Sequence, residues 1–223
     1  MKQLPLDLGP EPDQRLARFV VGANAELLAH LQGLGPGEPP TLIWGGAGSG
    51  KTHLLHGLAR QWREQGQAVA AFDAEARGRW ELAPTVRLVL IDDVDRLDET
   101  QQHQAFALFI EAVGQGATVV ATSRAPAVDL PLREDLRTRL GWGPSFALQP
   151  LDEGALRELL LQDGLRRGLQ LPAELLDYLL LRFARDPAHL IPLLDRLDQY
   201  ALRLKRAPTV PLLRQMLNEP DPV

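Results

Sequence analysis

A glycine-rich run that ends in Lys51-Thr52 is the part of the sequence whose residue types most clearly suggest chemistry. It reads Gly45-Gly46-Ala47-Gly48-Ser49-Gly50-Lys51-Thr52 and matches the phosphate-loop pattern G-x-x-x-x-G-K-[ST] in full. Glycines let successive backbone N–H groups converge on one phosphate, and a helix that begins there adds a favourable dipole. Lys51 supplies a compact, mobile charge for the β- and γ-phosphates. We therefore expect nucleotide contacts from Gly46, Ala47, Gly48, Ser49, Gly50, Lys51, Thr52 and His53.

Two carboxylates later in the chain provide the second half of such a site. The apolar run Leu88-Val89-Leu90-Ile91 indicates a buried strand, and Asp92-Asp93 follow it directly. The hydroxyl of Thr52 and the carboxylate of Asp92 are hard oxygen ligands for Mg²⁺, while Asp93 could orient a water. The sequence thus predicts a metal site at Thr52 and Asp92 and a catalytic role for Asp93.

These residues need a scaffold that gathers strand ends, and the apolar pattern predicts one. Short apolar runs indicate strands over residues 41–44, 68–72, 87–91, 117–121 and 145–148, with helices over about 24–34, 51–65 and 101–113. The runs lack strict alternation, so we expect a sheet covered on both faces, as parallel sheets are. Strands that alternate with helices predict an α/β fold with a five-stranded parallel sheet.

The pattern of apolar residues changes after Pro150. Residues 151–218 carry many leucines at helical spacing, among them Leu175, Leu176, Leu179 and Leu180, and no strand-like run. We expect a mobile tail over residues 1–16, an α/β nucleotide-binding domain over 17–150 and an all-α lid domain over 151–223.

Composition narrows the function classes. The 223 residues carry a net charge of −5 and no cysteine, which excludes a disulfide framework, a thiolate zinc site and a cysteine nucleophile. The acidic balance argues against a strongly basic nucleic-acid surface, so the Arg166-Arg167 pair is expected at a solvated helix end. The chain starts without a long apolar signal segment, which favours a cytoplasmic protein with no membrane contact.

With these motifs, the chain resembles the AAA+ ATPases, and within them the DnaA branch, from Arg15 to about Leu217. Phe19-Val20-Val21-Gly22-Ala23-Asn24 is similar to the segment that holds adenine in that branch, which implies contacts from Val20 and Val21. The segment 135–143 resembles the branch's box VII, in which an arginine reaches a neighbouring subunit's nucleotide. The resemblance implies ADP or ATP with Mg²⁺ as cofactors and identifies Arg139 as an arginine finger.

The N-terminal Gln3-Leu4-Pro5-Leu6-Asp7-Leu8 is similar to peptides that dock on the bacterial sliding clamp. An extended backbone would place Leu4, Leu6 and Leu8 on one face for an apolar groove, while the Gln3 amide would bond at the pocket rim. DnaA initiators continue into a DNA-binding domain, whereas this chain stops after the lid. Together these features resemble a regulatory inactivator of DnaA. The resemblance implies a negative regulator of replication initiation that binds the DNA polymerase sliding clamp, reaches DNA only through it, and stimulates ATP hydrolysis by DnaA with Arg139.

Two positions depart from the DnaA pattern. Arg124 stands where the family commonly has an Asp as its first sensor, although Thr122 or Ser123 could substitute, and Ala188 stands where the second-sensor Arg is expected. Both changes make hydrolysis by this chain doubtful, whereas nucleotide binding through the loop amides, Lys51 and Thr52 is less affected.

Two other functions stay open at this point. One is a self-sufficient motor, such as a helicase loader that hydrolyses ATP itself. The other is a DnaA-like recruitment factor that does not use the clamp. The sequence also leaves open which nucleotide is carried, and whether Arg139 serves a second copy of the chain through self-association or DnaA.

Overall fold

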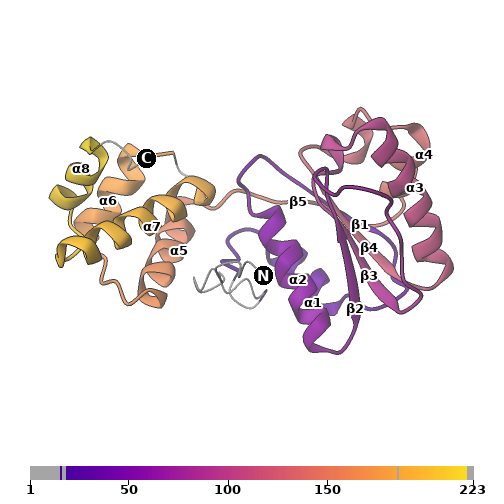
Figure 1. Cartoon of the computed structure of the whole chain (residues 1–223), viewed down its shortest axis with the longest axis horizontal. Helices are drawn as coiled ribbons and strands as arrows, with labels where there is room; N and C mark the ends of the chain where they lie inside the picture. Colours follow the sequence, from indigo (N-terminus) through magenta and orange to yellow (C-terminus); the bar gives the residue numbers. More distant parts are fainter. Residues whose placement is uncertain (1–15, 17–18, 185, 220–223) are drawn as a thin grey trace, which may run out of the picture.

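The computed structural model describes residues 16, 19–184 and 186–219. Its strands are β1 (Thr41–Trp44), β2 (Ala68–Phe72), β3 (Val86–Ile91), β4 (Thr118–Ser123) and β5 (Ser145–Ala147). Its α-helices are α1 (Ala25–Gly33), α2 (Lys51–Glu64), α3 (Glu99–Gly114), α4 (Glu134–Leu140), α5 (Glu153–Arg166), α6 (Ala173–Arg182), α7 (Pro187–Leu204) and α8 (Val210–Asn218), with short 3₁₀ turns η2 (Val94–Arg96) and η3 (Ala127–Asp129). The elements form two lobes, the sheet with α1–α4 and the bundle of α5–α8 (Figure 1).

The five strands form one sheet in the order β2-β3-β4-β1-β5, and every pairing is parallel. This confirms the predicted α/β fold with a five-stranded parallel sheet. All carboxyl ends of the strands therefore lie at one edge. Since β4 lies between β1 and β3, the segments that follow these three strands meet at the same place.

The lobe that contains the sheet has two hydrophobic cores, one on each face, and successive residues of a strand point into different cores. Leu88 and Leu90 of β3 pack with the buried leucines of α1 and α2. Val89 and Ile91 face the other way and pack with α3 and α4. Figure 1 accordingly shows α1 and α2 on one side of the sheet and α3 and α4 on the other. Each fully buried aliphatic side chain contributes about 1.5–3 kcal/mol, so this double burial holds the strand ends in place.

Helices α5–α8 pack around a third core made largely of leucine. The predicted inner face of α6 is buried in it, with Leu175, Leu176, Leu179 and Leu180 all inaccessible to solvent or nearly so. The described part of this segment, which we call the lid, contains no strand. The all-α character expected of the lid is thus confirmed.

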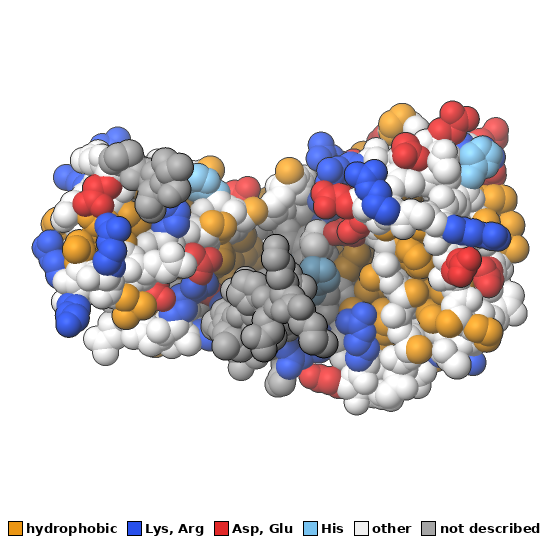
Figure 2. Space-filling view, viewed as in Figure 1, with side chains coloured by type: hydrophobic (Ala, Val, Ile, Leu, Met, Phe, Trp, Pro, Cys, Tyr) orange, Lys and Arg blue, Asp and Glu red, His pale blue; other side chains and the backbone are white. Residues whose placement is uncertain are grey.

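The surface carries charges of both signs, and the described helices lack the long apolar stretches of membrane spans. On the face shown in Figure 2, basic and acidic side chains are interspersed over both lobes. No helix within the described ranges combines the length and the apolar character that crossing a membrane requires.

Candidate nucleotide-binding site

The phosphate loop connects β1 to α2 in a conformation that depends on glycine. Gly48 and Gly50 have φ angles of 73° and 100°, a region that other residues rarely adopt. The Gly45 N–H donates to the Ser123 carbonyl over 3.1 Å, which ties the loop to the end of β4. Helix α2 then begins at Lys51 without a side-chain cap, so its first N–H groups remain available to an anion.

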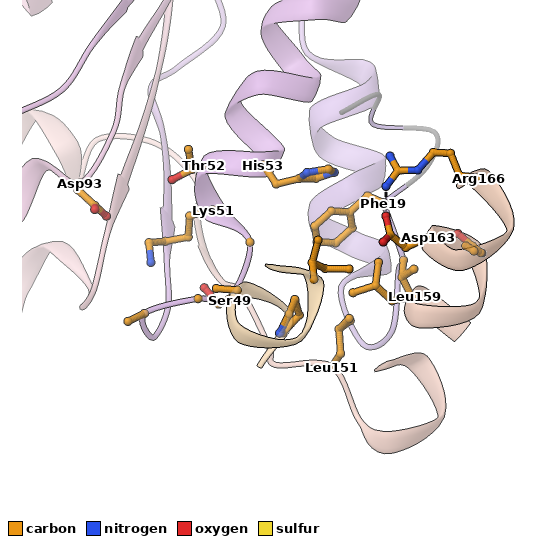
Figure 3. Close-up of a pocket in the computed structure, with 18 of the residues that line it drawn as sticks. Phe19, Ser49, Lys51, Thr52, His53, Asp93, Leu151, Leu159, Asp163 and Arg166 are labelled. Atoms are coloured by element: carbon orange, nitrogen blue, oxygen red, sulfur yellow. Dashed lines mark hydrogen bonds and ion pairs between the residues drawn. The ribbon is translucent and has the colours of Figure 1, made fainter. Parts of the chain in front are cut away.

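Lys51 is folded back along this loop. Its Nζ donates to the Gly45 carbonyl over 2.9 Å and to the Gly46 carbonyl over 3.0 Å. Only 6% of the residue is exposed. The ammonium is therefore held beside the loop, as Figure 3 shows, where it could attract the negative charge of a phosphate.

The structure brings the two predicted metal ligands together. Thr52 Oγ1 donates to Asp92 Oδ2 over 2.6 Å, and the hydroxyl of Thr122 donates to the other oxygen of Asp92. Hydroxyl and carboxylate oxygens are ligands that Mg²⁺ accepts, usually with phosphate oxygens and waters completing its shell. No group of three or more His, Cys, Asp or Glu side chains among the described residues is arranged for a metal ion. The donors present suit Mg²⁺ held jointly with a nucleotide.

Asp93 faces the same cavity from an unusual backbone conformation. Its φ of 46° lies in the left-handed region, and its N–H donates to Thr122 Oγ1 over 2.8 Å. Burial raises the pKa of the Asp93 carboxyl, the charge of Asp92 raises that pKa further, and Lys51 opposes both. A carboxylate so placed can accept a proton from a water or orient one.

A cavity of about 760 Å³ separates the phosphate loop from the lid. Nine of the residues predicted to serve the site line it: Val20, Ala47, Gly48, Ser49, Gly50, Lys51, Thr52, His53 and Asp93. Three do not: the predicted metal ligand Asp92, which accepts a hydrogen bond from Thr52, and two predicted nucleotide contacts. Val21 is 41% exposed and lies outside the lining, and Gly46 takes part only through its carbonyl, which accepts from Lys51.

The lid supplies lining residues that the motifs did not indicate. They are Leu151, Leu159, Gln162, Asp163, Leu165, Arg166, Pro187 and Ile191; Ala188, at the expected second-sensor position, and Phe19, in the expected adenine segment, line the cavity as well. The Arg166-Arg167 pair was the available signal: it lies at the end of α5 with Arg166 exposed, as expected, but it also has a buried partner that the sequence did not indicate. Both arginines bond to Asp163, which is 4% exposed, because a buried carboxylate needs cationic partners.

The start of α7 closes over the phosphate loop. The carboxylate of Asp186 accepts from the Ala188 N–H over 2.9 Å and caps the helix. The same carboxylate lies against Gly48 so closely that a Cβ there would collide with both of its oxygens. Ala188 lines the cavity with a methyl group and brings no charge to the expected second-sensor position.

At the first-sensor position, Arg124 is directed toward Asp95. Its backbone N–H donates to Asp95 Oδ1 over 3.1 Å, and its Nε lies 3.6 Å from Asp95 Oδ2. Ser123 Oγ donates to the Ala125 carbonyl over 2.6 Å. Of the two candidate substitutes, Thr122 is thus the one that contacts Asp92 and the backbone of Asp93.

Arg139 lies apart from the cavity. It belongs to α4, and its Cζ stands 3.8 Å from the centroid of the Trp142 ring. With Phe106, Arg133 and Thr138, both residues line a second, open recess on the surface, which we call the α4 recess. The predicted clamp-binding residues Gln3, Leu4, Leu6 and Leu8 fall outside the described residues.

Comparison with known proteins agrees with this geometry. Residues 152–217 match the family model described as the Hda lid domain. Domain III of the replication initiation protein DnaA from Thermotoga maritima matches at 23% identity with a TM-score of 0.79, over 93% of this chain and 96% of that one.

Two further structures share the fold. The AMPPCP-bound DnaA from Aquifex aeolicus matches at 21% identity with a TM-score of 0.70, over 88% of this chain and 69% of that one. The RuvB branch-migration motor from Thermotoga maritima matches at 15% identity with a TM-score of 0.64, over 92% and 68% of the two chains.

The five-stranded parallel sheet, the phosphate loop and the likeness to DnaA domain III give this chain an AAA+ fold. Within that fold, residues 152–217 are similar to the Hda lid domain, and the chain as a whole is similar in fold to DnaA domain III.

Proposed function

We propose that this chain is a nucleotide-bound negative regulator of replication initiation that supplies Arg139 to ATP on DnaA. It would carry ADP or ATP with Mg²⁺ in the cavity, with the base near Val20 and the phosphates on the loop amides and Lys51. Gln3, Leu4, Leu6 and Leu8 would dock it on the DNA polymerase sliding clamp, and through the clamp on DNA.

The position of Arg139 is the observation that carries this proposal. Arg139 lies in the α4 recess, while the cavity is lined by other residues. An arginine held outside its own nucleotide site suits a nucleotide bound to another molecule. A guanidinium supplied to a developing phosphoryl charge increases hydrolysis by about 10³ to 10⁵.

The chain's own residues suit binding better than turnover. Lys51 and the loop amides would hold the phosphates, Thr52 and Asp92 would hold Mg²⁺, and the metal would neutralise phosphate charge. Against rapid hydrolysis, Arg124 is paired with Asp95, and Ala188 offers no cation. A helicase loader with its own ATPase activity would instead show sustained ATP turnover by the purified chain.

The test is stimulation of ATP hydrolysis by purified DnaA with clamp loaded on DNA. Arg139→Ala should lose stimulation by at least about 100-fold while its nucleotide affinity stays unchanged. Arg137→Ala, on the same helix, is the matched control and should retain stimulation. Full stimulation of DnaA by the Arg139→Ala variant would reject Arg139 as the arginine finger. If Gln3→Ala still needed the clamp for stimulation and still bound it, the N-terminal segment would be rejected as the docking site.

A further inference from the structure

Asp163 of α5 is a buried carboxylate with two arginine partners. It accepts from a terminal amino group of Arg166 and, over 2.6 Å, from Nε of Arg167. Arg167 also bonds to Asp195 of α7, so it links the two helices inside the lid. Such a cluster keeps the buried charge compensated.

The two arginines differ in where they face. Arg166 lines the cavity and its side chain is 36% exposed, whereas Arg167 lies outside the lining at 21%. Because Arg167 stays on Asp163, the guanidinium of Arg166 can turn toward a ligand without leaving the carboxylate unpaired.

Arg166 stands at the end of the cavity where planar side chains gather. Figure 3 shows Phe19, His53 and Arg166 on one side, with Lys51 and Asp93 on the other. The rings of Phe19 and His53 have centroids 6.0 Å apart, and the Phe19 ring also lies against Gly50. Burial lowers the pKa of His53, and the nearby His56 and Arg166 lower it further.

We propose that Arg166 is the lid's contact to the nucleobase. This inference rests on the proposed nucleotide binding, which places phosphates at Lys51 and leaves the base on the Phe19–His53 side. The guanidinium would turn from Asp163 and stack on the base, since planar guanidinium groups stack on aromatic faces. Among the described lid residues that line the cavity, Arg166 is the one cation. Binding of the base would therefore change the position of this lid side chain.

The experiment compares ADP with inorganic pyrophosphate, which has no base, by calorimetry on nucleotide-stripped full chain. Arg166→Ala should weaken ADP binding roughly tenfold and leave pyrophosphate binding unchanged. Arg166→Lys should behave like the alanine variant, because it keeps the charge and lacks the planar face. The matched control is Arg157→Ala, also on α5, whose side chain pairs with Asp177 outside the cavity.

Each other outcome overturns the inference. Unchanged ADP affinity would exclude contact with Arg166, equal losses for ADP and pyrophosphate would assign it to phosphates, and rescue by lysine would show that charge alone matters. The thermal midpoint of ligand-free Arg166→Ala should stay close to that of the wild type, whereas Arg167→Ala should lower it. A larger loss in Arg166→Ala than in Arg167→Ala would show that Arg166, and not Arg167, is the main partner of Asp163. A wild-type chain that binds no ADP would instead defeat the proposed function itself.

Discussion

Asp93 illustrates how one side chain is placed by its neighbours. It follows β3 with a φ of 46°, and its carboxylate is partly buried beside Asp92. Burial raises the pKa of Asp93, and the charge of Asp92 raises it further. The ionised form is therefore disfavoured in the fold relative to the unfolded chain, so stability is lost as pH rises through the raised pKa.

Replacing Asp93 by Asn should therefore stabilise the ligand-free protein at neutral pH. Asn tolerates a left-handed backbone and removes the unfavourable charge. We expect a rise in the thermal midpoint on the order of 1–3 °C. The gain should vanish at pH values below about 4, where the unfolded carboxyl is also protonated. Thermal unfolding followed from about pH 3 to 8 measures this, and a gain that grows toward acid would contradict the assignment.

Sequence patterns predicted the residues that a local motif defines. Lys51 and Thr52 belong to one contiguous run, and Asp92 meets Thr52 because parallel strands end at one edge. Arg166 reaches the cavity, and Asp186 the phosphate loop, only through packing of the lid, so no spacing in the chain relates them to the loop.

Helices and strands bring the site together through their ends. The phosphate loop starts α2, and α7 begins directly opposite, with its capping Asp186 against Gly48. Strands β1, β3 and β4 were predictable because each is a short apolar run that is largely buried, and the half-buried edge strands β2 and β5 are also mostly apolar. Helix α4 was not predicted, since it has only seven residues and buries just Leu136 and Leu140.

Gly48→Ala tests the contact between the loop and α7. The new methyl group would collide with the Asp186 carboxylate and would occupy a φ of 73°, so the carboxylate that caps α7 must move. We expect a loss of at least about tenfold in ADP affinity, together with about 1–2 kcal/mol of stability from the backbone strain alone.

Gly66→Ala provides the control for Gly48→Ala. Its φ of 76° imposes a similar backbone cost, but nothing lies within 4 Å of the added carbon. Calorimetric titration of ADP and thermal unfolding of both variants distinguish the effect of backbone strain from the effect of the collision with Asp186. Equal ADP affinities in the two variants would show that Asp186 and Gly48 do not matter to the site.

Considered whole, the molecule has independent cores in its two lobes and a cavity between them. A nucleotide held there would contact both lobes and couple the lid to the phosphate loop. At 100 times its dissociation constant, such a ligand stabilises the folded state by about 2.7 kcal/mol. The α4 recess would stay free to meet another protein.

Calorimetric titration of ADP into the nucleotide-stripped chain tests the central claim most directly. The structure predicts saturable binding at one site per chain, with a loss of at least about 100-fold in Lys51→Ala, whose folding is checked by thermal unfolding. A flat titration of the wild-type chain, or equal affinity in the folded Lys51 variant, would contradict the account.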